Sequence, residues 1–486
     1  PPLAGLVIAL LASLGCLPAG RYGSAPRSTR PQSVSQPQAT QPAKATPVPV
    51  RPEPLSPDLA WMEPTPTQLE RPIPIVFVHE TSDRAEWNKL QQFWTPEPRL
   101  PQPSQVVGWL GGSPWLAAGL ALTPSGVGQV KLKVPLGLDD PTAYIPPSNP
   151  LTLQKWELGK RLFFDPDHVL PPNAHGKKLS CASCHDPATG FTDKNVLPRN
   201  PPTLINSVYN AHQFWDGRAS ALEEVVQRNL EDERDTGADG YQRHAWSGVI
   251  GRLRQNKDYV AQFRRAFGTP PTQDAVGKAL ACYLRTILSG DSLHDRAEWA
   301  MKQRGSNQLE ARDYEKVLDD AALLALQEPG EGMPAKAEVA RELFTGWTLF
   351  HGKAGCVQCH GGRQFTDQGF HNIGEGDSNN TRPPGEEIGR FASLPPGLKD
   401  RRLIGAFKTP GLRALPRTRP YLHDGLRQDL FEVVHLHVKP AFGAPNLDPE
   451  IRERELTEGD KRALTRFLRA LDGGPVPAET TAGKRP

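Results

Sequence analysis

Apolar residues recur at intervals of three and four positions in several segments of the chain beyond residue 150, which predicts amphipathic helices. The expected helices cover residues 152–162, 218–230, 271–289, 335–350 and 457–472. The last has the clearest boundary signals, because Thr457 and Asp460 form a capping-box pattern and Gly473 follows its apolar stripe. Alternating strand patterns are scarce, so the chain is predicted to be mainly α.

The first part of the chain has a different pattern. Residues 1–20, PPLAGLVIALLASLGCLPAG, form an apolar run that is too short to span a bilayer but has the length of a secretory signal core. We therefore expect an exported, periplasmic protein, and Cys16, after small residues, is a candidate lipoprotein anchor. A buried helix is the alternative, but the Pro-rich residues 21–72 have the composition of a disordered linker and give such a helix nothing to pack on.

Two other segments carry no motif to which chemistry can be attached. Residues 73–134 contain aromatic residues with a short strand and helix pattern, and this N-terminal extension has no assigned role. Residues 474–486 are predicted to form a disordered tail.

Charge and cysteine content narrow the class of protein. A formal net charge of +3 without any Lys/Arg-rich run argues against a nucleic-acid partner. Six cysteines would suggest disulfides in an exported protein, but four of them belong to two Cys-x-x-Cys-His sites. Cys282 lies in a helical pattern and is predicted to be a small buried core residue.

The two Cys-x-x-Cys-His sites predict two covalently bound haem c groups. They consist of Cys181, Cys184 and His185, and of Cys356, Cys359 and His360. On one helical turn, residues i, i+3 and i+4 share a face, so two sulfurs can bond one haem edge while the histidine reaches the iron. A zinc knuckle would need further ligands at tight spacing, and a redox dithiol would not need the histidine. His185 and His360 are therefore the expected proximal ligands.

Segments around these sites resemble the bacterial di-haem cytochrome c peroxidase and methylamine-utilisation protein G family over residues 134–473. The segments include WELGKRLFFDP, PRNPPTLINSVYNAHQFWDGRASALEE, FKTPGLRALPRTRPYLHDG and LFEVVHLHV, in this order. Phe-Thr-Asp follows both sites, which suggests a duplicated haem-binding unit. The resemblance implies two cytochrome c-like domains, a peroxidatic one at 135–330 and an electron-transfer one at 331–473.

The resemblance also implies roles for several residues. The peroxidatic iron would be held by His185 and the electron-transfer iron by His360, with Trp215 as the relay between them. Without the resemblance, Trp215 would be an ordinary core aromatic residue. A calcium ion between the domains would be held by an asparagine and two backbone carbonyls, which fall on Asn200, Thr418 and Pro420; Asn200 and Pro420 would otherwise pass as turn residues.

The second ligand of the C-terminal iron departs from the family in residue type. Relatives place a methionine or a tyrosine at the position that here is His437, and two histidine ligands would lower the iron's potential relative to a histidine and a methionine. His435 is the rival ligand, whereas Met301 and Met333 are distant in motif context.

The far side of the N-terminal iron is expected to be open. Classical members of the family carry a removable histidine shortly after the first haem site, but here no histidine occurs between His185 and Arg199. Folding could still supply His168, His175 or His212 as a ligand.

The resemblance also implies a proton-transfer group near the N-terminal iron. The family's count from the relay tryptophan reaches Asp235, and Glu233 is its acidic neighbour. The glutamine expected near Val225 is absent, and an acidic loop is by default a solvated surface.

These features predict a peroxidase that reduces hydrogen peroxide with electrons from a small redox protein, a cytochrome c or a cupredoxin. A methylamine-utilisation-like oxidase acting on a protein partner is the first alternative. A non-catalytic electron-transfer cytochrome is the second. Many relatives dimerise, so a homodimer is an arrangement to test.

Overall fold

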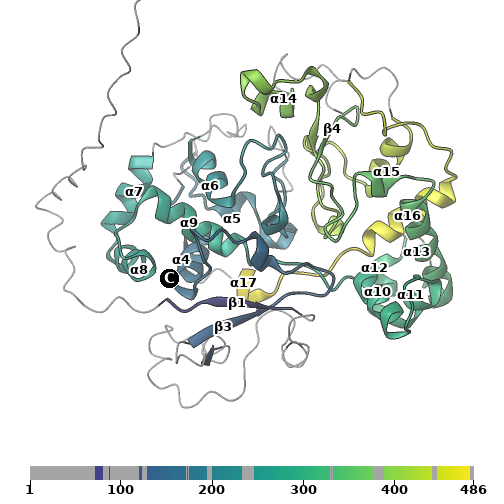
Figure 1. Ribbon diagram of the computed structural model, residues 1–486, viewed down its shortest axis with the longest axis horizontal. Coiled ribbons are helices and arrows are strands. Elements are labelled where there is room, and N and C mark those ends of the chain that lie inside the picture. The colour runs from purple at the N-terminus through teal and green to yellow at the C-terminus, as the bar shows by residue number, and fades with distance from the viewer. Residues whose placement is uncertain are drawn as a thin grey trace, which may run out of the picture. The chain divides into compact units, whose positions relative to one another are not determined.

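The structure is a computed structural model that describes residues 72–79, 87, 120–122, 128–170, 172, 175–193, 200–231, 246–328, 330, 332–375, 388–440 and 446–481. The described part is mainly helical (Figure 1). The longer helices are α4 (Leu153–Phe164), α6 (Leu222–Glu231), α7 (Trp246–Gln255), α8 (Lys257–Phe267), α9 (Gln273–Leu284), α10 (Leu293–Gln303), α13 (Lys336–His351), α15 (Leu430–Val438) and α16 (Glu458–Arg469). Shorter ones are α5 (Cys181–Cys184), α11 (Ala311–Val317), α12 (Asp320–Leu326), α14 (Arg390–Ser393) and α17 (Ala478–Thr481). No described helix has the length and apolar character needed to cross a membrane.

The five helices expected from the apolar pattern are present as α4, α6, α9, α13 and α16. At α16 the predicted capping box is formed, because the Thr457 side chain accepts from the Asp460 backbone N–H and the Asp460 side chain accepts from that of Thr457. The largest differences are at α6, which starts at Leu222, and α9, which ends at Leu284. Beyond Leu284 the chain makes tight turns with buried residues, which keep the apolar pattern without helical geometry.

A pair of closely packed helices forms the first core. Helix α4 crosses α9 at Gly159, where an added Cβ would lie 1.9 Å from the carbonyl oxygen of Ala279. Only glycine lets the two backbones approach this closely. Next to the crossing, the rings of Phe163 and Tyr283 pack with their centroids 5.1 Å apart. Cys282, on α9, is fully buried in this core.

The same arrangement occurs in the second half of the chain. Helix α13 crosses α16 at Gly346, where a Cβ would lie 2.2 Å from the carbonyl oxygen of Ala463. Four residues after this glycine, Phe350 packs against Phe467 with a centroid distance of 5.4 Å. A glycine crossing followed by an aromatic pair in both halves supports the duplicated unit that the sequence suggested.

Residues 293–326 pack with the second core rather than the first. Leu309, Tyr314 and Leu323 are buried in one cluster with Val339 and Leu343 of α13. Figure 1 shows α10, α11 and α12 beside α13 and α16. The division predicted at residue 330 stays a prediction; in the structure the apolar faces of these short helices pack with α13 and with Ala470.

The N-terminal extension and the chain's end both contribute to the first core. Strands β1 (Ile75–Val78), β2 (Leu120–Leu122) and β3 (Gly128–Lys133) form a sheet in the order β1-β3-β2, with β1 parallel to β3 and β2 antiparallel. Its buried residues, including Val130 and Leu132, belong to that core. Val476 joins the same core, and the Tyr283 hydroxyl donates to the Thr480 carbonyl over 2.8 Å. The prediction of a disordered tail is thus corrected for residues 474–481.

Several predictions fall outside the described residues. They concern the signal segment at 1–20 with Cys16, nearly all of the linker at 21–72, residues 482–486, and the loop with Glu233 and Asp235.

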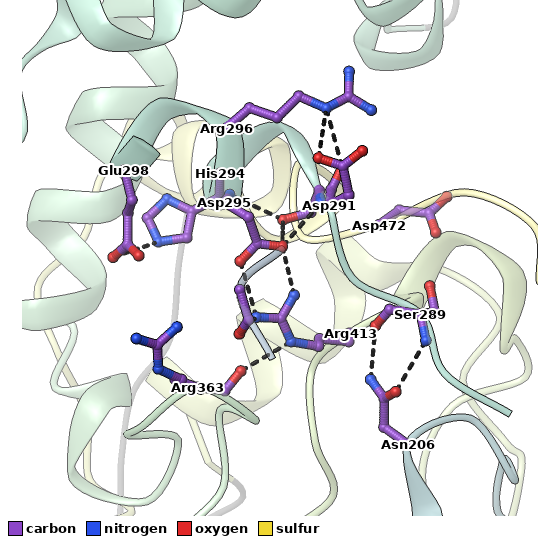
Figure 2. A network of polar contacts seen from close by, with 12 residues as sticks. Asn206, Ser289, Asp291, His294, Asp295, Arg296, Glu298, Arg363, Arg413 and Asp472 are labelled. Atoms are coloured by element: carbon purple, nitrogen blue, oxygen red, sulfur yellow. Dashed lines mark hydrogen bonds and ion pairs between the residues drawn. The ribbon is translucent and has the colours of Figure 1, made fainter. Parts of the chain in front are cut away.

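A buried ion pair ties distant segments together (Figure 2). Arg413 donates from Nη1 and Nη2 to the two carboxylate oxygens of Asp295, over 2.7 and 2.9 Å. Arg413 also donates to the carbonyl oxygens of Gly137 and Arg363, over 2.8 and 2.9 Å. Burial raises the pKa of Asp295, but the charge and hydrogen bonds of Arg413, together with the hydrogen bond from Ser292, lower it overall. Removing one partner of such a pair costs about 3–5 kcal/mol, because it leaves the other charge buried and alone.

Candidate active site

The first Cys-x-x-Cys-His site is built on a single helical turn. Helix α5 spans Cys181–Cys184, and the His185 backbone N–H donates to the Cys181 carbonyl over 2.9 Å. Ser180 caps the turn in a box with Ser183. None of the four cysteines of the two sites forms a disulfide in the structure.

Both histidines of these sites are held by the carbonyl of a phenylalanine. Nδ1 of His185 lies 3.0 Å from the Phe191 carbonyl oxygen, and Nδ1 of His360 lies 2.9 Å from that of Phe365. Each contact makes Nδ1 the N–H donor and leaves the Nε2 lone pair for a metal. Both phenylalanines have left-handed backbones, with φ of 59° and 54°, a strained conformation that aims the carbonyl at the ring. The repeated Phe-Thr-Asp motif therefore has a structural purpose.

Burial keeps both imidazoles neutral. It lowers the pKa of His185, and it lowers the pKa of His360 to about 4. A neutral imidazole with a free Nε2 is the form that binds a metal.

A cavity of about 780 Å³ lies beside the first site. Cys181, Cys184 and His185 line it, and much of the remaining wall is apolar, including Val225 and Leu230 of α6. Two thiols, one imidazole and an apolar space with basic groups in its wall fit a covalently attached haem, whose ring is apolar and whose propionates are anionic.

Trp215 lies in the wall of this cavity and connects to both halves of the chain. Its indole N–H donates to the Asn200 carbonyl over 2.7 Å. Its own carbonyl accepts from the Lys408 backbone N–H over 2.8 Å. The predicted relay is therefore fixed by hydrogen bonds at each end.

The residues predicted to hold calcium come from both halves. The Asn200 side chain lies 2.7 Å from the Pro420 carbonyl oxygen and 2.9 Å from that of Leu422. Thr418 and Pro420 line the same cavity as Asn200. One side-chain amide facing backbone carbonyls is a donor set suited to a hard cation, provided that the amide presents its oxygen.

At the second site the structure distinguishes between the two candidate ligands on α15. His437 Nδ1 lies 2.8 Å from the Val433 carbonyl, which leaves its Nε2 available as in His185 and His360. Burial and, more weakly, the electrostatic interaction with His437 lower the pKa of His360. His435 is exposed, and its Nδ1 lies 3.1 Å from the Lys461 ammonium.

Comparison with known proteins identifies this architecture. The family model of di-haem cytochrome c peroxidase matches residues 153–303. Methylamine utilization protein MauG from Methylorubrum extorquens is 33% identical over 344 residues, covering 68% of this chain and 82% of that protein. The chain belongs to the di-haem cytochrome c peroxidase and MauG family.

Other relatives agree with this membership. Cytochrome c551 peroxidase from Pseudomonas aeruginosa is 28% identical over 363 residues, covering 69% of this chain and 86% of the relative. A crystal structure of a MauG-like protein associated with microbial copper homeostasis shares the fold with a TM-score of 0.53 and 24% identity, covering 70% and 95% of the two chains. The chain is accordingly a peroxidase-like oxidoreductase, and its family implies two haem c groups.

His168, His175 and His212 are the histidines that folding could supply as a ligand to the far side of the first haem. Their surroundings in the structure differ. His168 has both ring nitrogens engaged, with Nδ1 2.9 Å from Asp165 and Nε2 3.2 Å from the Asn256 amide. His175 is exposed. His212 lines the cavity, and its ring packs against Phe370 with a centroid distance of 5.3 Å.

Two polar residues of the cavity were missed by sequence reasoning. The family's glutamine was expected near Val225, and Asn229 lines the cavity one helical turn after that residue. The i, i+4 spacing on α6 was the signal that could have found it. Lys408, in the FKTPGLR segment, is the other; nothing in its sequence context distinguishes a buried lysine from a surface one.

Proposed function

We propose that this protein reduces hydrogen peroxide to water at the haem attached by Cys181, Cys184 and His185. Each turnover takes two electrons and two protons per peroxide and yields two water molecules. When bound, the haem supplies the redox-active iron at which the O–O bond breaks. The electrons come from a small redox protein, a cytochrome c or a cupredoxin, and enter through the haem held by His360.

The cavity beside His185 is the observation that carries this proposal. The Phe191 carbonyl fixes the histidine in the tautomer that binds iron, and α6 closes the cavity with apolar side chains. Engagement of His168 by Asp165 and Asn256 removes one alternative ligand. A far side left free for peroxide is consistent with this arrangement.

The protein's side chains bind and orient peroxide and transfer its protons. Asn229 is a hydrogen-bond donor in the cavity wall and can orient a peroxide, but an amide does not exchange protons at neutral pH. A proton acceptor is still required, and Asp235 or Glu233 is proposed for it. Replacing each with its amide tests the role: unchanged peroxide turnover in both variants removes them from the mechanism.

The electron route and the metal site are proposed together. Trp215 is the relay, and its hydrogen bond to Asn200 joins it to the residue proposed to hold calcium. Asn200, Thr418 and Pro420 would supply oxygen ligands, and His437 would be the second axial ligand of the C-terminal haem.

Steady-state kinetics tests the proposed activity. The holoprotein is mixed with reduced cytochrome c, and cytochrome oxidation is followed before and after hydrogen peroxide is added. We expect oxidation that depends on peroxide and saturates with it. A protein with both haems attached and no peroxide-dependent oxidation, with either a cytochrome c or a cupredoxin as donor, would contradict the proposal.

A MauG-like oxidation of a protein partner is the second candidate, because two MauG proteins are 33% and 30% identical to the chain. Such an enzyme would consume peroxide with little cytochrome c turnover and would leave oxidised side chains on a partner, which mass spectrometry detects. His437 stands where that branch is expected to have tyrosine.

Export to the periplasm is proposed from the signal-like residues 1–20, with Cys16 as the site of a lipid anchor. Labelling with a radioactive fatty acid, compared between the natural sequence and Cys16→Ser, tests the anchor. A homodimer is proposed by analogy with relatives, and light scattering of the holoprotein tests it.

A further inference from the structure

Two segments of the chain have the same backbone arrangement and exchange equivalent hydrogen bonds. The Asn200 backbone N–H donates to the His423 carbonyl over 2.9 Å, and the Lys408 backbone N–H donates to the Trp215 carbonyl over 2.8 Å. Asn200 precedes Trp215 by the same number of residues as Lys408 precedes His423. The first residue of each segment therefore hydrogen-bonds the backbone of an aromatic residue in the other segment, His423 or Trp215.

Further backbone features match at the same offset. Asn206 and Ala414 have φ of 58° and 63°, and a 3-10 helix follows each of them. Isolated β-bridges join Gln213 to Ala219 in one segment and Tyr421 to Arg427 in the other. Gly217 and Gly425, with φ of 65° and 67°, end the two turns. The internal duplication thus includes residues 200–219 and 408–427 in addition to the two haem-attachment sites.

Within this repeat, Lys408 takes the place of Asn200. Asn200 directs its side chain at the Pro420 carbonyl, and the proposed calcium ion would lie among these groups. Lys408 directs its ammonium at Asn210, the counterpart of Thr418, with Nζ 3.3 Å from Oδ1, and at the Thr409 carbonyl, 3.1 Å away. A positive charge carried by a side chain thus occupies the position that the other segment offers to a metal ion.

The Lys408 charge differs from those of the neighbouring arginines. Arg413 and Arg218 also line the cavity, but Asp295 and Asp216 neutralise them in buried ion pairs. Among the described residues, no carboxylate lies within ion-pair distance of the Lys408 ammonium, and its side chain is buried at 7% exposure. Burial lowers the pKa of Lys408 to about 8, against the opposing charge of Asp367, so the ammonium stays mostly charged at neutral pH.

We propose that Lys408 is a positioning residue that serves as a built-in cation for the Trp215 segment, and that its charge acts on the haem in the cavity it lines. The ammonium anchors Asn210, five residues before Trp215. An uncompensated positive charge in this wall also favours the ferrous over the ferric haem, because the ferrous state carries one positive charge less. The comparison with Asn200 rests on the proposed calcium site, whereas the effect of the charge does not.

Spectroelectrochemistry of the resting holoprotein tests this role without peroxide or an electron donor. With the cell poised at the wild-type midpoint of the N-terminal haem, Lys408→Met should raise the ferric-to-ferrous ratio about tenfold, the effect of one charge at roughly 10 Å in a protein interior. Lys408→Arg keeps the charge and should restore the ratio to within about twofold of wild type.

Lys155→Met is the matched control. Lys155 is also buried and also donates to an asparagine and a backbone carbonyl, Asn149 Oδ1 over 3.1 Å and Pro150 over 3.0 Å, but it does not line the cavity. A ratio in Lys408→Met equal to that of wild type, or equal to that of Lys155→Met, would overturn the proposal. Because the measurement involves neither turnover nor calcium, a failure of the proposed peroxidase activity would leave its outcome unaffected.

Discussion

Trp215 donates its indole N–H to the Asn200 carbonyl oxygen across 2.7 Å, so the proposed relay and the proposed metal ligand are directly joined. Trp215→Phe removes this donor and the indole ring. We expect electron transfer between the haems to slow and calcium affinity to fall about fivefold, since one hydrogen bond contributes about 1 kcal/mol. Stopped-flow reduction kinetics and calcium titration measure the two effects.

Trp156→Phe is the control for this prediction. Trp156 is buried in the first core and donates its N–H to Thr286 over 2.8 Å, away from the cavity lining. Equal slowing in both variants would show that loss of a core tryptophan, rather than of the relay, is being measured.

His437→Ala should convert the C-terminal haem from low spin to high spin. The half-buried His437 ring interacts electrostatically with His360 and has its Nδ1 engaged by Val433, so its Nε2 is the available ligand atom. His435→Ala on the same helix should leave the spectrum unchanged, because His435 is exposed and next to Lys461. Electron paramagnetic resonance of the ferric proteins decides, and the reverse result would exchange the two assignments.

Gly346→Ala should destabilise the second core by about 3 kcal/mol or more, because the added Cβ meets the carbonyl of Ala463 in a packed helix crossing. Gly251→Ala is the matched helical control. Nothing lies within 4 Å of a Cβ added there, so this variant should gain about 0.5–1 kcal/mol from helix propensity. Thermal unfolding of the holoproteins compares them, and equal stability would mean that the crossing relaxes.

The sequence predicted the elements whose signals are local. The five amphipathic helices, the capping box at Thr457 and the burial of Cys282 depend on spacing within a few residues, and the structure has all of them. The packing of residues 293–326 against α13 and of Thr480 against Tyr283 depends on which apolar faces meet across the chain. Spacing along the chain does not carry that information.

The features of the candidate site likewise include some that a local sequence pattern predicts and others that depend on the fold. Haem attachment is a five-residue pattern and could be recognised from the sequence alone. The carbonyl contacts of Phe191 and Phe365 require left-handed backbones that ordinary propensities disfavour, so no local signal predicts them. Likewise, Lys408 is buried where its strand pairs with Phe370 and its backbone N–H bonds the Trp215 carbonyl, contacts that join residues distant along the chain.

Asp295→Asn should destabilise the protein by about 3–5 kcal/mol, because it leaves the Arg413 guanidinium buried without its carboxylate. The Asp295–Arg413 ion pair also predicts that the wild-type protein loses stability in acid. Since the folded-state pKa of Asp295 is lowered, its contribution is full above the unfolded value of about 3.9 and is lost as the pH falls toward the folded value. Denaturant unfolding between pH 3 and 7 should show this loss in the wild type and not in the variant. Asp400→Asn, at an exposed pair with Arg402, should have the wild-type profile.

The charge of Lys408 predicts a pH dependence of the N-terminal haem. Its pKa is lowered to about 8, so the ammonium favours the ferrous state below that pH and loses its charge above it. At a fixed electrode potential, the ferric fraction should therefore rise between pH 7 and 9.5. Of the other charged groups around Lys408, the pKa of His212 lies below its usual value, through burial, Arg390 and Lys408, while Asp367 stays ionised and Arg390 charged. The pKa of His371, on the strand paired with that of Lys408, is raised to about 10, so its titration begins only at the top of this window and is common to the wild type and both variants. Lys408→Met and Lys408→Arg should both remove the step, with the ferric fraction high throughout in the first variant and low in the second. A step that persists in Lys408→Arg would assign the titration to a different group.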